Sequence, residues 1–184
     1  MSKEDDRAAL RKKTQEMLKK NIPTDLSSDD KQFQIMTGMS TTSLRAKWAK
    51  GSRETSCNSF AGWVAQAIGI TNSVLSRGVL DISKAENEVA GCWTWANTSE
   101  TIYDDTCHPH AGDFYSGPFP GQQFGHVGVV YDFDEIAQTW TLIQGGQGGP
   151  KSNMDFIKWK TVKFDGASIN GWVDTAWYMI PGYD

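Results

Sequence analysis

The sequence predicts an α+β fold, with helices in the first part of the chain and short antiparallel strands in the last third. One observation is an apolar stripe of helical period that starts at Cys57. Another is a series of short β-branched and aromatic runs after residue 122, each bounded by Gly, Pro, Asp or Asn. At 184 residues the chain is long enough for one domain with a substantial core. Helices that precede the strands, instead of alternating with them, are typical of the α+β class.

The first fifty residues are expected to form a helical appendage that packs on the body. Residues 4–21 are typical of a polar helix ending before Pro23, and residues 41–50 of a second short helix. The segment is too polar to build a core alone, so we expect it to pack on a domain formed by residues 51–184. A recognition or export segment is the alternative interpretation of residues 1–50.

A largely buried helix is predicted over residues 57–68. Its apolar positions recur with helical spacing, and they are Phe60, Ala61, Val64, Ala67 and Ile68. Gly69 provides the stop, and a hydroxyl of Thr55 or Ser56 is expected to cap the first turn. Cys57 therefore lies where the helix dipole and free N–H groups favour the thiolate. A small, inert core cysteine is the alternative.

Four strand-like runs follow an irregular insertion over residues 72–110. They cover residues 123–133, 138–144, 158–164 and 171–180. The first run contains His126 close to two glycines, and glycine within a strand often marks the close approach of another chain or ligand. Strand alternation places His126 on the same face as Gly128 and Val130.

The first two runs are expected to form a hairpin that turns at residues 134–137. Such a turn pairs residues whose numbers sum to about 270, which opposes His126 to Gln144 on one face. A glutamine there can hold the imidazole in one tautomer. Cysteine, histidine and a polar partner in this order are the components of thiol-peptidase chemistry, with the Cys57 amide as first oxyanion donor. A histidine satisfied in an ordinary hairpin is the alternative.

Charge and cysteine spacing exclude several classes of function. Residues 1–50 hold 11 of the 18 Lys and Arg, whereas no cation occurs between Lys84 and Lys151. That stretch is a poor surface for nucleic acid, and it predicts an acidic cleft suited to amine-bearing peptides. The three cysteines lack zinc-site spacing, and no apolar run is long enough to span a membrane. We therefore expect no nucleic acid, no membrane span, no metal and no cofactor.

Three segments resemble the NlpC/P60 and CHAP peptidases. T-S-C-N-S-F at 55–60 is similar to their cysteine-bearing helix start, A-G-D-F-Y at 111–115 to their next strand entry, and G-H-V-G-V-V at 125–130 to their histidine strand. The resemblance covers about half of the chain, residues 57–146. It implies a papain-like α+β fold and a cell-wall peptide amidase with Cys57 as nucleophile and His126 as base.

Gln144 would be the third catalytic residue, with Asp132 and Asp134 as rivals. Thr55-Ser56 stands where the family usually has Asp, and Asn58-Ser59 where it has Ser-Gly. The other two thiols, Cys92 and Cys107, either form a disulfide that staples the insertion or stay reduced.

The N-terminus lacks the apolar segment of a signal peptide. Together with the resemblance, this suggests an antibacterial type VI secretion effector, made in the cytoplasm and acting in the target-cell periplasm. Its partners would be peptidoglycan peptides and possible immunity or secretion-apparatus proteins. The alternatives are a protease, deamidase or acyltransferase acting on a target-cell protein, and a non-catalytic Trp-rich binding module.

Overall fold

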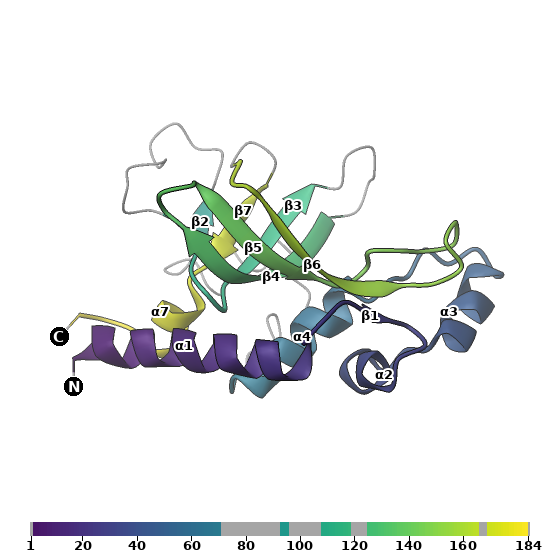
Figure 1. Cartoon of the computed structure of the whole chain (residues 1–184), viewed down its shortest axis with the longest axis horizontal. Coiled ribbons are helices and arrows are strands. Elements are labelled where there is room, and N and C mark those ends of the chain that lie inside the picture. The colour runs from purple at the N-terminus through teal and green to yellow at the C-terminus, as the bar shows by residue number, and fades with distance from the viewer. Residues whose placement is uncertain (1, 71–92, 96–107, 119–124, 166–168, 184) are drawn as a thin grey trace.

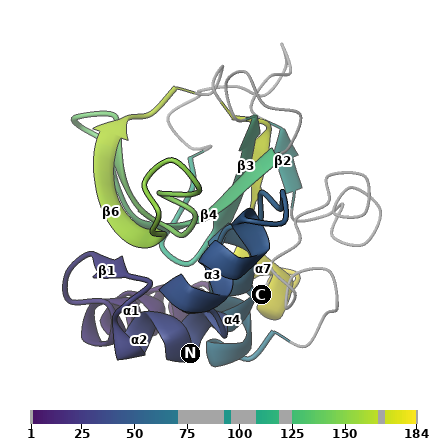
Figure 2. The same ribbon diagram turned by 90° about the vertical axis from the view of Figure 1, so that its right-hand side faces the viewer.

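The computed structural model of the chain describes residues 2–70, 93–95, 108–118, 125–165 and 169–183. Helices lie along one side of a curved antiparallel sheet (Figures 1 and 2), so the predicted α+β class is confirmed. The described strands are β1 (Leu26–Ser27), β2 (Trp93–Trp95), β3 (Phe114–Pro118), β4 (Gly125–Asp134), β5 (Thr139–Gln144), β6 (Phe156–Lys163) and β7 (Gly171–Val173). Their order in the sheet is β1-β6-β5-β4-β3-β7-β2.

The helices in the described part of the chain are α1 (Lys3–Asn21), α2 (Lys31–Thr37), α3 (Thr41–Trp48), α4 (Cys57–Ala67) and α7 (Thr175–Met179). Three of them, α1, α3 and α4, match the helices predicted over residues 4–21, 41–50 and 57–68 within two residues at each end. Capping explains where α1 and α3 begin, because Ser2 and Ser40 each accept the N–H three residues on. The short helix α2 was not predicted, because its seven residues are too few to display a period.

The main hydrophobic core lies between the helices and the sheet. Phe60 and Val64 of α4 pack there with Val129 of β4, and all three are fully buried. Leu18 of α1 and Phe33 of α2 belong to the same cluster. Burying a side chain of this size contributes about 1.5–3 kcal/mol. Helices from the first fifty residues therefore share one core with α4 and the sheet.

The opposite face of the sheet carries a second cluster, formed by Tyr115, Val130, Trp140, Leu142, Ile169 and Trp172. The alternation expected for β4 is present, since Val127 and Val129 face α4 and Val130 faces the second cluster. His126 and Gly128 have the same parity as Val130. They therefore lie on the face that is turned away from the helices.

The hairpin between β4 and β5 differs from the predicted register by two residues. Val129 pairs with Ile143 and Val130 with Leu142, and a bulge follows Val130. The turn is residues 135–138 because the Asp134 carboxylate accepts the N–H groups of Ile136 and Ala137. Direct opposition of His126 and Gln144 is therefore wrong. An even shift preserves the faces, so both side chains still lie on one side.

The predicted strand over residues 171–180 is only partly correct. β7 ends at Val173, and the Asp174 carboxylate then accepts the N–H of Trp177 and starts α7. The N-capping aspartate therefore ends the strand by starting a five-residue helix. Most of the insertion predicted over residues 72–110 lies outside the described residues, and so do Cys92 and Cys107 with their possible disulfide. None of the described helices is long and apolar enough to cross a membrane.

Candidate active site

Cys57 is the first residue of α4, and a buried hydrogen-bond network fixes the residue before it. Ser56 is fully buried, and its N–H donates to Asp155 Oδ2 at 2.7 Å. Its hydroxyl accepts the N–H of Gly146 at 2.9 Å instead of capping the helix, so the predicted hydroxyl cap is wrong. The start of α4 is therefore held by other segments of the chain, not by its own cap.

The glycine-rich loop that follows Gln144 packs directly against the residues at the start of α4. A Cβ on Gly145 would lie 2.8 Å from the carbonyl oxygen of Ser56, closer than side chains tolerate. Gly146 has φ +72°, and a Cβ there would lie 2.8 Å from Thr55 Oγ1 and 3.2 Å from the Cys57 Cβ. Glycine thus lets the end of β5 approach the start of α4. Gln144 and Cys57 are positioned by the same contacts.

The Cys57 thiol is half-buried between α4 and β4. Thr55 donates its hydroxyl to Sγ at 3.7 Å. The N–H groups of Asn58 and Val127 also donate to the sulfur and lower the pKa of the thiol. Burial outweighs these bonds, and the pKa is raised above its ordinary value of 9.0, with the Asp155 charge acting in the same direction. The expected resting thiolate is therefore not what this environment favours, and Cys57 is a neutral thiol near pH 7.

His126 lies beside the residue that touches the thiol, since Val127 follows it in β4. Its Nε2 is 3.2 Å from Oε1 of Gln144. An amide oxygen only accepts, so Nε2 carries the proton and Nδ1 carries the lone pair. Burial lowers the pKa of His126 below 6.5, the Gln144 bond raises it and the Lys160 charge lowers it further. The imidazole is therefore a neutral base.

The structure joins His126 to Gln144 and not to either rival. Asp132 Oδ1 accepts from Gln15 of α1 at 3.3 Å, and Asp134 caps the hairpin turn. Gln144 is buried, and from the β4–β5 register it lies diagonally across from His126. Of the three candidates for the third residue, Gln144 alone contacts the imidazole.

Tyr115 and Asp155 belong to the site, and sequence reasoning missed both. Tyr115 pairs with Gly128 across β3 and β4, and a Cβ on Gly128 would lie 2.4 Å from the tyrosine ring. The tyrosine ring meets the His126 ring edge-on at 6.2 Å. Burial, with the negative charge of a Cys57 thiolate, raises the pKa of Tyr115, so the phenol keeps its proton. Gly128 was the available signal for a close neighbour, but it did not say which residue approaches.

Asp155 holds the loop before the nucleophile through several donors. Its carboxylate accepts the N–H groups of Ser56, Phe156 and Gly148 and the Ser56 hydroxyl. Burial nevertheless raises its pKa. The sequence offers no sign of this role, because Asp155 and Ser56 are 99 residues apart.

His108 and His110 lie away from this site. His108 stacks on Phe133 at the far end of β4 and approaches Glu135 at 2.9 Å. His110 packs against His108 and lies 3.9 Å from the buried Asp113 carboxylate. Both histidines are half-buried.

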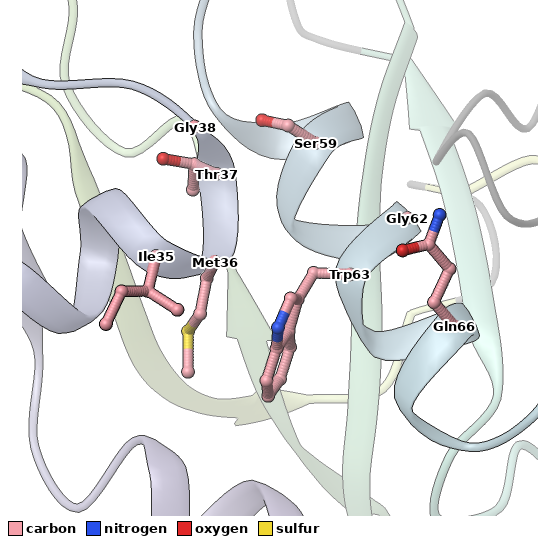
Figure 3. Close-up of a pocket in the computed structure, with 8 residues that line it drawn as sticks. All are labelled: Ile35, Met36, Thr37, Gly38, Ser59, Gly62, Trp63 and Gln66. Atoms are coloured by element: carbon pink, nitrogen blue, oxygen red, sulfur yellow. The ribbon is translucent and has the colours of Figure 1, made fainter.

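A groove between α2 and α4 (Figure 3) is also separate from the thiol. It is lined by Ile35, Met36, Thr37, Gly38, Ser59, Gly62, Trp63 and Gln66, none of which is titratable or a metal ligand. Within the described ranges, no three His, Cys, Asp or Glu side chains gather as a metal site. The chemistry that the described residues support is therefore that of a thiol and an imidazole.

Comparison with protein-family models, with curated proteins and with solved structures gives no match to this chain.

Proposed function

We propose that the protein is a papain-like cysteine hydrolase of the NlpC/P60 kind, cleaving amide bonds in peptidoglycan peptides as a secreted antibacterial effector. The observation that carries the proposal is the 3.2 Å contact between His126 Nε2 and Gln144 Oε1, in a strand whose next residue, Val127, donates its N–H to the thiol at the start of α4. An oriented base beside a nucleophile is the arrangement that acyl transfer requires.

The reaction would begin from the neutral pair. Nδ1 of His126 takes the thiol proton of Cys57 while the sulfur attacks the amide carbonyl carbon. The oxygen of the tetrahedral intermediate is met by free N–H groups in the first turn of α4, that of Cys57 first among them. The imidazolium returns its proton to the leaving nitrogen, the C–N bond breaks, and a thioester remains on Cys57.

The thioester is then hydrolysed with His126 as base. The imidazole takes a proton from water as the water oxygen attacks the thioester carbonyl, and the C–S bond then breaks while the imidazolium gives its proton to the departing sulfur. The products are a free carboxylic acid and the regenerated thiol. Gln144 keeps Nδ1 directed at the reacting atoms in both halves of the cycle.

The choice of peptidoglycan as substrate rests on the resemblance of residues 55–60, 111–115 and 125–130 to cell-wall peptidases. Purified sacculi test it directly. Wild type should release soluble muropeptides, and Cys57→Ala should lower the rate by about 10³-fold or more. The matched control is His110→Asn, which changes a half-buried histidine outside the site.

Equal release by wild type and Cys57→Ala would overturn the role of Cys57. Intact sacculi, together with a cleaved or modified protein in a target-cell lysate, would favour the alternative of a protein substrate. A Cys57 thiol that does not react with an alkylating probe even at pH 9 would favour a non-catalytic module.

A further inference from the structure

The register of β5 and β6 places two lysines on the face that carries His126 and Gln144. Lys158 pairs directly with Gln144, and Lys160 pairs with Leu142. Directly paired residues share a face, and residues two apart in a strand do as well. Both ammonium groups therefore project from the side of the sheet on which the His126 imidazole lies.

The charge of Lys160 acts on His126, the proposed base. The Lys160 charge lowers the pKa of His126, in keeping with the place of both residues on one face of the sheet. Lys158 is half-buried and its Nζ lies 4.7 Å from the centre of the Phe156 ring, so its stem lies along the sheet. Lys160 is exposed.

Neither lysine is neutralised by the described part of the protein. The ion pairs there involve Arg7, Arg11, Lys47, His108 and His110. Asp155, whose charge acts on the thiol, is buried and already accepts several backbone N–H groups. Two cations without an ion-pair partner among the described residues, beside a proposed reaction centre, are a candidate site for an anion.

We propose that Lys158 and Lys160 form a subsite for a substrate carboxylate close to the scissile amide. The inference rests on the proposed hydrolase function and names its substrate class: an acidic peptide with a free carboxylate, and not an amine-bearing one. Cα atoms two apart in a strand are separated by about 7 Å, so both flexible ammonium groups can reach one carboxylate. A substrate amine in that place would be repelled.

The charge proposed for this subsite is opposite in sign to the acidic cleft expected from composition. The stretch between Lys84 and Lys151 has no cation, but the fold lays β6, which comes after it, beside β5. Of the residues on β4, β5 and β6 that share the His126 face, Lys158 and Lys160 are the charged ones. Pairing of strands, and not the local sequence, decides the sign of charge next to Gln144.

The test uses two synthetic stem-peptide fragments that differ only in one group: a carboxylate next to the scissile amide, or the carboxamide in its place. The kcat/KM of each is measured for wild type, for Lys158→Gln/Lys160→Gln, and for Lys163→Gln. Lys163 is exposed on the same strand but has the opposite parity, so it faces the other side. Binding of both peptides to Cys57→Ala, measured by calorimetry, gives a readout independent of catalysis.

Wild type should favour the carboxylate peptide by about tenfold, because two partly exposed ion pairs together supply roughly 1.4 kcal/mol. The double variant should reduce this ratio to below about twofold, and 0.5 M NaCl should do the same to wild type. Lys163→Gln should keep the wild-type ratio. A general effect of Lys160 on the pKa of His126 acts on both peptides equally, so it cancels in the ratio.

A ratio near one in wild type, or a preference that survives the double variant, would overturn the subsite while leaving the hydrolase proposal standing. Failure to cleave either peptide, together with normal preferential binding to Cys57→Ala, would keep the subsite and reject the hydrolase. Neither cleavage nor binding of either peptide would reject both.

Discussion

His126 and His110 are both half-buried near β4, but the groups around them differ in kind. His126 has an uncharged partner, Gln144, and the neighbouring residue Val127 touches a thiol. His110 lies among charged groups, with Arg11, Asp174, His108 and Glu4 all acting on its pKa. Burial lowers the pKa in both places. A neutral, half-buried imidazole is therefore not by itself a sign of catalysis, and what distinguishes His126 is a strand neighbour that contacts the Cys57 thiol.

The largest expected effect separates the two histidines by activity. His126→Ala should lower kcat/KM by about 10³–10⁴-fold, because it removes the base that both proton transfers need. His110→Asn should change it by less than about twofold, since no reacting group lies near His110. Peptide cleavage assays on both variants, with circular dichroism to verify folding, measure this contrast. Equal losses in the two variants would remove His126 as the base.

The second effect concerns the close contact between Gly128 and the Tyr115 ring. Gly128→Ala places a Cβ 2.4 Å from the Tyr115 ring, which must move or strain the sheet. We expect a loss of about 2–3 kcal/mol in the free energy of unfolding. Gly125→Ala is the matched control on the same strand, where the nearest atom would be 3.7 Å away. Urea denaturation of both variants compares them, and equal stabilities would show that Tyr115 does not fill this space.

The third effect concerns the orienting residue. Gln144→Ala should lower kcat/KM by about 10–100-fold, because the imidazole loses its fixed tautomer but keeps its place. The Gln144 bond raises the pKa of His126, so its loss should move the acidic limb of the pH profile to lower pH. Gln144→Glu should move that limb to higher pH, since a carboxylate favours the imidazolium. An acidic limb that does not shift in either variant would contradict the contact between His126 and Gln144.

The smallest expected effect is the pH-dependent contribution of His110 to the free energy of unfolding. Its folded pKa of about 4 lies below the ordinary 6.5, so the unfolded chain binds the proton more readily. The stabilisation is thus complete above pH 6.5 and disappears as the pH falls towards 4. Between pH 7 and pH 5, wild type should lose on the order of 1–2 kcal/mol more than His110→Gln in urea unfolding. Identical losses would show that His110 titrates normally.

Local patterns were sufficient for the parts of the site that lie within one element. The apolar stripe after Cys57 predicted α4, although Ala65 and not Ala67 is buried. Gly69, the predicted stop, has a left-handed φ of +94°. The predicted direct pairing of His126 with Gln144 is wrong by two residues, but their side chains still share a face and make contact, because strand faces repeat every two residues. A slip of one residue would have put the two side chains on opposite faces.

Features that depend on tertiary contacts could not be read from the sequence. The Asp155–Ser56 bond joins residues 99 apart. Tyr115 reaches the site only because β3 lies beside β4, and Lys158 only because β6 lies beside β5. The pKa of Cys57 depends on burial, which outweighs the local helix effect that predicted a thiolate. The strand predicted over residues 171–180 is correct only as far as Val173, because the capping Asp174 then starts a helix.

Trapping the covalent intermediate tests the central claim most directly. A stem peptide that contains the scissile amide is mixed with enzyme and quenched in acid within the first turnover, and the protein is analysed by intact mass and peptide mapping. The account predicts an increase equal to the acyl fragment, located on Cys57 as a thioester and absent from Cys57→Ala. Release of the cleaved fragments with no adduct on Cys57, or an adduct on another residue, would contradict it.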